Sequence, residues 1–473
     1  MDSISVFEII KVGIGPSSSH TMGPWNAAEY FIDYLKENGV FGQLKAVQVH
    51  LFGSLAKTGV GHGTDLAVVM GLAGENFRKI DTRLIPDMLA KIKNDKVISA
   101  GGSLAIGFDF EKDIVFHFKE SLPFHPNGVR FTGTLNNGEE ISREYFSVGG
   151  GFVITENDTD SRIKKIVCPY PCHSALTIVD YCRKMNLSVS ELIMLNEKAW
   201  RTEEEVKQAA LNIFREIKEA IFRGINTPGI LPGGLNVKRR SAELNKKLLG
   251  EQTFTDLNDW IAKVRSVAPS FSNVNKWVSC FALAVNEENA AFGRIITAPT
   301  NGASGVLPAV MMYAYLFTED FTEEKAIRFI LTAGELGTLF KKNATISAAM
   351  GGCQAEVGVS SAMSAGALVE ILGGTPEQVL MAAEIAMEHH LGLTCDPIGG
   401  LVQIPCIERN SMGAIKAITA ANIAIESDPS DAKVSLDAVI KSMWETALDM
   451  NNKYKETSEG GLAVNVPVNV AEC

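Results

Sequence analysis

Between Ala282 and Ile425 the chain consists mainly of small and apolar residues, and this stretch limits the possible folds more than any other feature. Its apolar residues do not keep to one face of a helical repeat. Segments that are apolar on all sides are typical of central helices that neighbouring helices bury. Glycine pairs at 351–352, 373–374 and 399–400 interrupt the stretch and indicate turns. The sequence therefore predicts a helical core whose glycine-rich turns line a cleft.

The first third of the chain has a different character, because strand and helix patterns alternate there. Residues 47–51 alternate between apolar and polar side chains, which is the period of a half-buried strand. Residues 81–94 have the pattern of a short amphipathic helix. Asn137-Gly138 lies between two β-favouring runs and predicts a hairpin. We therefore expect an α+β domain over residues 1–165.

The pattern changes after residues 168–171, where two prolines indicate a connection rather than a helix. Beyond this point strand patterns nearly vanish. Apolar residues from Val206 to Ile221 recur on one helix face, and Gly224 then predicts the end of that helix. We expect a mainly α-helical second domain over residues 166–473.

Composition limits the classes of protein that are compatible with the chain. Of 473 residues, 46% are hydrophobic and 21% are charged, which is the balance of a soluble globular protein with two or three domains. The net charge of −11 provides no basic field for nucleic acid or an anionic membrane. No run of about 18 apolar residues predicts a membrane span, and the chain does not start like a secretory signal. We expect a cytoplasmic protein with neither nucleic-acid nor membrane partners.

Three of the eight cysteines stand out by their surroundings. Cys353, Cys395 and Cys406 each lie beside glycine or proline, where the backbone bends and lets a cofactor approach. Thiolates suit iron–sulfur clusters and zinc, but the absence of a CxxC pair disfavours a zinc ribbon or a ferredoxin-type carrier. Three dispersed thiolates would leave one iron of a 4Fe–4S cluster free to bind a substrate. Buried apolar cysteines explain the same pattern.

Residues 459–473 form an unusual C-terminal tail. Apolar residues alternate from Leu462 to Val470, Pro467 interrupts them, and Cys473 ends the chain. Frayed termini are usually polar. We therefore expect this apolar, extended tail to dock against the body of the protein.

Three longer motifs accompany the cysteines: GPSSSHTMGP at 15–24, TGVGHGTD at 58–65 and APTNGASGVLPA at 298–309. Together with the cysteine contexts and the final cysteine, they resemble the single-chain iron–sulfur L-serine dehydratases over essentially the whole chain. The resemblance implies conversion of L-serine to pyruvate and ammonia without pyridoxal phosphate. It also implies a beta-type N-terminal domain, an alpha-type helical domain, and a cluster site in the cleft between them.

The resemblance implies that Cys353, Cys395 and Cys406 hold a 4Fe–4S cluster. It further implies that Cys473 folds back onto the fourth iron in the resting state, so that the substrate has to displace it. The other cysteines lack matching contexts and are expected to be structural; they are Cys168, Cys172, Cys182 and Cys280.

Dehydration of serine needs a base for the α-proton and an electrophile for the hydroxyl group. Histidine titrates near neutrality, and a Lewis acid helps a hydroxide to leave. By the resemblance, His62 in VGHGTD is the base, and His20 and His125 support it in the cleft. The residues alone leave the choice among these three histidines open. The aminoacrylate product would tautomerise and hydrolyse to pyruvate and ammonia.

Hydroxyl groups and a carboxylate lie close to two of these histidines in the sequence. We expect them to bind the ammonium and carboxylate of serine; they are Ser17, Ser18, Ser19, Thr21, Thr64 and Asp65. A helix N-cap also explains PSSSHT, and a helix N-terminus favours a bound carboxylate. As a bare string, TNGAS is a turn before a helix at 306–317. By the resemblance it cradles the substrate carboxylate with Thr300, Asn301, Gly302, Ala303 and Ser304.

Several alternatives stay open at this point. A pyridoxal-phosphate enzyme needs a Schiff-base lysine, and Lys276 lies in a helix-like run instead of beside a glycine loop. The same elimination can act on L-threonine or L-cysteine, because the sequence does not show pocket size. A cluster-based redox sensor would not need the histidine and TNGAS motifs. In His62→Ala a sensor keeps its response to oxygen, whereas an enzyme loses turnover and keeps its cluster. We also expect a homodimer, the commonest symmetric assembly.

Overall fold

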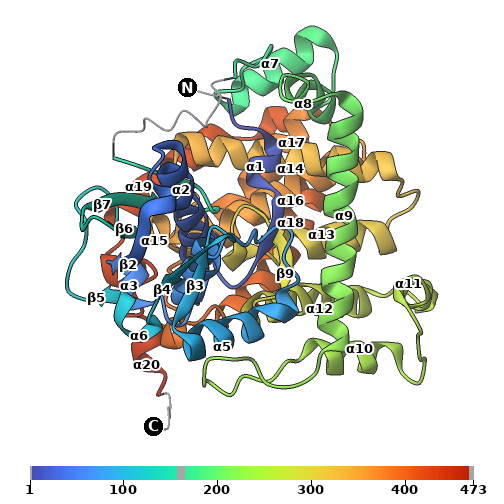
Figure 1. Ribbon diagram of the computed structural model, residues 1–473. Helices are drawn as coiled ribbons and strands as arrows, with labels where there is room; N and C mark the ends of the chain where they lie inside the picture. The colour runs from blue at the N-terminus through green and yellow to red at the C-terminus, as the bar shows by residue number, and fades with distance from the viewer. Residues whose placement is uncertain (1–2, 157–165, 468–473) are drawn as a thin grey trace.

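The computed structural model describes residues 3–156 and 166–467, which form two regions (Figure 1). The first region, drawn in blue and cyan, combines a sheet with helices. The second, drawn in green to red, is mainly helical. The predicted combination of an α+β part and a mainly α-helical part is confirmed.

Within the described residues, a sheet of seven strands forms the core of the N-terminal region, in the order β3-β4-β2-β6-β7-β8 with β5 paired to β2. The strands are β2 (Leu44–Phe52), β3 (Val97–Ala100), β4 (Leu104–Gly107), β5 (Ile114–His117), β6 (Gly128–Leu135), β7 (Glu140–Ser147) and β8 (Val153–Ile154). The helices of this region are α2 (Gly23–Glu37), α3 (Ser54–Lys57), α4 (Thr64–Leu72), α5 (Ile85–Asp95) and α6 (Phe110–Asp113). Phe31 of α2 stacks on Phe131 of β6, with ring centroids 5.4 Å apart, so this helix shares one core with the sheet.

The sequence patterns of the N-terminal region are confirmed. The apolar members of residues 47–51 are buried and belong to β2. Residues Thr82–Leu84 form a 3₁₀ turn that continues as α5. Gly138, at φ +86°, makes the turn of the hairpin between β6 and β7.

The second region contains most of the helices. They are α7 (Ala175–Met185), α8 (Val189–Glu197), α9 (Glu203–Asn226), α10 (Ser241–Leu249), α11 (Leu257–Ser266), α12 (Phe271–Ala290), α13 (Val306–Phe317), α14 (Glu323–Asn343), α15 (Ala348–Gly351), α16 (Val357–Ile371), α17 (Pro376–Glu388), α18 (Cys406–Ile425), α19 (Leu436–Asp449) and α20 (Leu462–Asn465). Every residue of α16 is buried, because α13, α14, α17 and α18 pack around it. The expected helical core is therefore confirmed. Among the described residues, no helix is both long and apolar enough to cross a membrane.

Gly224 does not end α9, contrary to the prediction, since the helix continues to Asn226. A Cβ at Gly224 would lie 2.4 Å from the carbonyl oxygen of Ala284 on α12. The glycine thus allows close contact between two helices. The helix ends where Asn226 and Thr227 donate side-chain hydrogen bonds to carbonyls of its last turn.

The first residues of the chain belong to the helical core. Val6 and Ile9, both in α1 (Val6–Ile9), are buried among its residues. The next strand, β1 (Lys11–Ile14), pairs antiparallel with β9 (Arg294–Thr297), a strand inside the mainly helical region. The N-terminal segment therefore ties the two regions together before the chain enters the α+β part.

Candidate active site

Two histidine-bearing segments lie side by side and are locked to each other. Ser17 caps the turn that follows it, because its hydroxyl accepts a hydrogen bond from the His20 N–H at 3.1 Å. The Thr21 hydroxyl donates to the carbonyl of His62 at 2.8 Å, and the Thr64 hydroxyl donates to the carbonyl of His20 at 2.6 Å. The predicted N-cap is present, and the two threonines hold the backbone of the histidine segments.

His62 is fully buried and has no hydrogen-bond partner on either ring nitrogen among the described residues. Burial lowers its pKa to about 4, so the ring is neutral at pH 7. Buried polar atoms in proteins are nearly always paired. A neutral, unpaired imidazole is therefore free to accept a proton from a bound molecule.

His20 is fixed by its neighbours. Its Nδ1 lies 2.8 Å from Ser19 Oγ and 3.5 Å from Glu456 Oε1, and its Nε2 lies 2.9 Å from Ser54 Oγ. Burial and the nearby His62 hold the pKa of His20 well below its usual value. The two ring centroids are 4.6 Å apart. His20 is thus oriented next to the free ring of His62.

His125 is close to this pair and is half-buried. Its Nδ1 accepts a hydrogen bond from the N–H of Asn127 at 3.1 Å. Burial lowers its pKa to about 4, and a proton on its ring would lower the pKa of the nearby His20 further. His125 thus lies in the neighbourhood of the His20–His62 pair, without a hydrogen bond to either ring among the described residues.

The TNGAS turn uses its side chains in two ways. Asn301 holds the turn in place, because its side-chain N–H donates to the Ile14 carbonyl at 2.5 Å and its side-chain oxygen accepts from the Thr297 hydroxyl at 2.6 Å. The Ser304 hydroxyl is buried and has no partner among the described residues, whereas the buried Thr300 hydroxyl faces Glu356 and lowers the pKa of that carboxyl group. The Ser304 hydroxyl is therefore free to bind a ligand, and the Thr300 hydroxyl lies beside a buried carboxyl group.

Gly302 brings the same turn against a buried carboxyl. A Cβ at this position would lie 2.6 Å from Glu356 Oε2. Asn410 donates to the Gly302 carbonyl at 2.7 Å, and the Ser360 hydroxyl donates to the Ala303 carbonyl at 3.4 Å. The absence of a side chain at Gly302 is therefore required for the close approach to Glu356.

The three predicted ligand cysteines lie on three separate elements and are all buried. Cys353 lies in a 3₁₀ turn after α15, Cys395 in the loop after α17, and Cys406 at the start of α18. The sulfurs of Cys353 and Cys395 and a carboxyl oxygen of Glu356 lie within 4.8 Å of one another. Burial and the adjacent Cys353 raise the pKa of Cys406.

The glycine beside Cys353 explains why these elements can meet. Gly352 has φ +70°, and a Cβ there would lie 2.8 Å from the Leu393 carbonyl oxygen. That carbonyl accepts a hydrogen bond from the Gln354 N–H at 3.0 Å. The turn of Cys353 is thus bonded directly to the loop of Cys395.

The site also contains charged residues that the sequence patterns did not reveal. Burial raises the pKa of Glu356 to about 7. Burial, followed by the charges of Glu356 and Cys353, raises the pKa of Glu456 well above its usual value. Arg409 donates a hydrogen bond to Cys353 Sγ at 3.6 Å. An ammonium or metal cation in this acidic site would favour the ionised forms of both carboxyls.

Glu456 connects the histidine group to the cysteine group. One of its carboxyl oxygens and nitrogens of His20 and His62 lie within 4.8 Å of one another, and its charge also acts on Cys395. The histidines belong to the N-terminal region and the cysteines to the helical region. The combined site therefore lies where the two regions meet.

Two of the predicted substrate residues are less well placed. Ser18 is buried, and its carbonyl accepts a hydrogen bond from Gly23. Asp65 is half-buried, burial raises its pKa, and the side-chain charges that act on it are those of Lys93 and Glu111. One oxygen of Asp65 is buried without a partner, and no hydrogen bond joins Asp65 to the histidine group among the described residues.

The described part of the C-terminal tail differs from the expected extended chain. Residues Leu462–Asn465 form one helical turn, α20, and Val464 is 59% exposed. Gly460, just before this turn, is buried. Cys473 lies outside the described residues, so its predicted position on the cluster stays a prediction.

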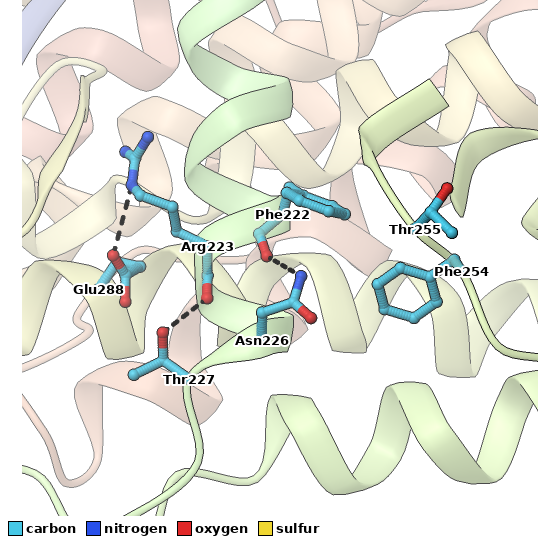
Figure 2. Close-up of a pocket in the computed structure, with 7 residues that line it drawn as sticks. All are labelled: Phe222, Arg223, Asn226, Thr227, Phe254, Thr255 and Glu288. Carbon is cyan, nitrogen blue, oxygen red and sulfur yellow. Dashed lines mark hydrogen bonds and ion pairs between the residues drawn. The ribbon is translucent and has the colours of Figure 1, made fainter. Parts of the chain in front are cut away.

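A separate open pocket of about 400 Å³ lies at the C-terminal end of α9 (Figure 2). It is lined by Phe222, Arg223, Asn226, Thr227, Phe254, Thr255 and Glu288. Arg223 Nε lies 3.6 Å from Glu288 Oε2. The pocket contains none of the predicted site residues, and we assign no chemistry to it.

Comparison with known proteins agrees with the two-region organisation. Residues 5–158 match the family described as "Serine dehydratase beta chain", and residues 184–463 match "Serine dehydratase alpha chain". The chain is 47% identical to an L-serine dehydratase of Streptomyces coelicolor, with 98% of this chain and 99% of that protein covered. It is 46% identical to an L-serine dehydratase of Haemophilus influenzae, with 98% and 100% covered. It is 42% identical to that of Helicobacter pylori, with 98% and 99% covered.

Matches over nearly the full length of both chains define this protein as an enzyme of the lyase class. It belongs to the serine dehydratase family. The beta-chain match covers the α+β region, and the alpha-chain match covers the helical region.

Proposed function

We propose that the protein is an iron–sulfur L-serine dehydratase, which converts L-serine to pyruvate and ammonia. The observation that carries the proposal is a buried, neutral and unpartnered His62 that lies with His20 around Glu456, a carboxyl group that also interacts electrostatically with Cys353 and Cys395. The curated relatives that the chain matches are named L-serine dehydratases. Their names support the substrate, and the site geometry supports the chemistry.

The donor set fits an iron–sulfur cluster. Cys353, Cys395 and Cys406 supply three soft ligands in a buried position, beside the guanidinium of Arg409, which favours thiolate over thiol. These three residues would hold a 4Fe–4S cluster. When bound, the cluster supplies a Lewis acid for loss of the serine hydroxyl. By the family resemblance, Cys473 is the proposed fourth ligand in the resting state.

Side chains of the TNGAS turn and of the adjacent Glu356 bind the substrate. The hydroxyl of Ser304, which has no partner among the described residues, and the hydroxyl of Thr300, which faces Glu356, suit the substrate carboxylate, because a carboxylate accepts hydrogen bonds. Glu356, held against Gly302, is a carboxyl group placed to bind the ammonium. In this arrangement the α-carbon of serine lies between the TNGAS turn and the histidine group.

Proton removal is the task of His62. Its neutral ring accepts the α-proton, because neither ring nitrogen is engaged by the described residues. His20 is held by Ser19 and Ser54 and keeps its ring beside His62. Elimination of water gives aminoacrylate, which tautomerises to an imine. Hydrolysis of the imine then releases pyruvate and ammonia.

The decisive experiment measures pyruvate formed from L-serine by protein purified without oxygen, with iron content and visible absorption recorded on the same sample. We expect turnover, bound iron and absorption to disappear together on brief exposure to air. An iron-free protein that still deaminates serine in air would overturn the cluster proposal. Parallel assays with L-threonine and L-cysteine test substrate choice, and size-exclusion chromatography tests the expected homodimer.

A further inference from the structure

Residues 454–462, which we call the strap, lead into α20 and lie against the loop that carries Cys395. The Cys395 N–H donates to the carbonyl of Tyr454 at 2.8 Å, and the Glu456 N–H donates to the carbonyl of Cys395 at 3.0 Å. The Ser458 hydroxyl donates to the Pro397 carbonyl at 2.9 Å. The strap is thus bonded along the loop that carries Cys395.

The N-terminal region holds the same segment from the opposite side. The Ser54 hydroxyl donates to the Glu456 carbonyl at 3.0 Å. Lys57 Nζ lies 2.7 Å from Glu459 Oε1, and both side chains are partly exposed. An exposed ion pair of this kind contributes little to the free energy of folding. The buried contacts on the helical side are therefore the stronger anchors.

Asp396 is the anchor of the end of the strap. It is buried, and its Oδ2 accepts a hydrogen bond from the Leu462 N–H at 2.8 Å. Gly461 has φ +63°, and a Cβ there would lie 2.2 Å from the same oxygen. Glycine is therefore required at this position, so that the chain can turn closely around the carboxylate.

Arg409 joins this anchor to the thiol group. Its guanidinium donates to Asp396 Oδ1 at 2.8 Å, to the Thr394 carbonyl at 2.7 Å and to Cys353 Sγ at 3.6 Å. A planar guanidinium can serve several acceptors in fixed directions, whereas an ammonium cannot reproduce that geometry. One side chain therefore contacts a predicted ligand and the carboxylate that fixes the strap.

We propose that Arg409 and Asp396 are positioning residues. They couple the binding of the strap to the loop of Cys395 with the protection of the Cys353 sulfur from solvent and reagents. This proposal rests on the proposed function only for the identity of the group that the thiols hold. When Asp396 no longer binds the Leu462 N–H, the strap loosens, and the Cys353 sulfur loses its ordered neighbour. Strap opening and exposure of the thiol site are then one event.

The test compares the full-length protein, purified without oxygen, with Asp396→Asn and Arg409→Lys. The rate of hydrogen exchange at the Leu462 amide measures opening of the strap. The rate of alkylation of Cys353 by iodoacetamide, followed by mass spectrometry, measures exposure of the thiol. Loss of a hydrogen bond to a charged group corresponds to about tenfold or more in an opening equilibrium, so we expect both rates to rise by about that factor in Asp396→Asn. Arg409→Lys should change both in the same direction. If iron is present, the visible absorption should also bleach several-fold faster in air.

Arg328→Gln is the matched control, because it removes another buried-carboxylate pair, Arg328 with Glu370 at 3.1 Å, and leaves the strap intact. It should leave both rates unchanged. Faster exchange at Leu462 without faster alkylation of Cys353 would overturn the coupling, as would unchanged exchange in Asp396→Asn. A protein without iron or pyruvate formation would refute the proposed function, but the exchange and alkylation rates would still decide the role of Arg409 and Asp396.

Discussion

The protein contains two groups of three buried cysteines, and their surroundings differ. Cys168, Cys172 and Cys182 form one group near α7, α8 and α14, and Cys353, Cys395 and Cys406 form the other. Burial raises the pKa of thiols in both. Burial alone therefore does not distinguish a ligand from a structural cysteine.

In the first group two of the three thiols donate hydrogen bonds to backbone carbonyls. Cys168 Sγ lies 3.9 Å from the Asn196 carbonyl oxygen, and Cys172 Sγ lies 3.3 Å from the Tyr170 carbonyl oxygen. Burial raises the pKa of Cys182 to about 12. Hydrogen bonds for Cys168 and Cys172, and the raised pKa for Cys182, favour the protonated thiol, which is a poor metal ligand.

The second group differs in the charge and the backbone around it. A guanidinium, that of Arg409, contacts Cys353, and Gly352 lets the backbone of two ligand-bearing segments approach. The group also lies where two regions of the protein meet. The comparison shows that convergence of separate elements around a cation, rather than burial, is the feature that identifies the proposed cluster ligands.

The largest expected difference comes from replacing one cysteine in each group. Cys395→Ser should abolish bound iron and pyruvate formation, because even outer partners of metal ligands change affinity by about 10- to 100-fold. Cys182→Ser should retain both. Iron analysis and the pyruvate assay on the two variants measure the contrast. Retention of full iron by Cys395→Ser would remove the distinction between the groups.

His62→Ala tests whether the second group works together with a base. We expect pyruvate formation to fall by about 100- to 10,000-fold, the usual contribution of a general base, with iron content unchanged. His390→Ala is the matched control. His390 is also buried with a pKa lowered to about 4, but its Nδ1 lies 2.7 Å from the Ala386 carbonyl oxygen within the helical core. Equal losses in the two variants would contradict a specific role for His62.

Glu335 beside the first group should make stability depend on pH. Burial raises its pKa to about 7, and one of its oxygens has no partner among the described residues. Because its folded pKa exceeds the unfolded value, the folded state binds the extra proton, and stability falls as pH rises from about 4.5 to 7. Glu335→Gln should remove this fall and be more stable than the natural protein at pH 8 by about 1–3 kcal/mol. Denaturant unfolding at pH 5 and pH 8 measures the difference in unfolding free energy between the two proteins. An equal gain in stability at both pH values would contradict the raised pKa of Glu335.

The smallest effect is expected from Cys172→Ala. Removal of one buried sulfur from a packed core should lower the free energy of unfolding by about 1 kcal/mol. Iron content and turnover per folded molecule should not change. Thermal unfolding and iron analysis check both statements, and a loss of iron would mean that the first group also holds metal.

The fold was largely predictable, because its main patterns are local. The alternation in residues 47–51, the Asn137-Gly138 turn and the helix at 306–317 each follow from neighbouring residues. Adjacent glycine and proline singled out the three predicted ligand cysteines, and their burial on separate elements agrees with that pattern, whereas their role as ligands stays a prediction.

The charged partners of the site could not be predicted, because they depend on contacts between distant segments. Ser54 and Glu456, which bond at the site, are 402 residues apart in the sequence. No local sequence pattern predicts that Arg409 contacts the thiol of Cys353 or that Asp396 binds Arg409. The helix end predicted at Gly224 was wrong for the same reason, since this glycine serves a contact with the distant Ala284 and does not end its own helix.

The pairing of β1 with β9 determines what would happen if the gene were divided between the codons for residues 156 and 166. The first product would carry Val6 and Ile9 away from the core that buries them, and the second would lack the strand that pairs with β9. Neither polypeptide would be a complete folding unit. The two would have to be produced together and would assemble as an obligate heterodimer, so complementation in the same cell, not separate purification, is the route to a working split protein.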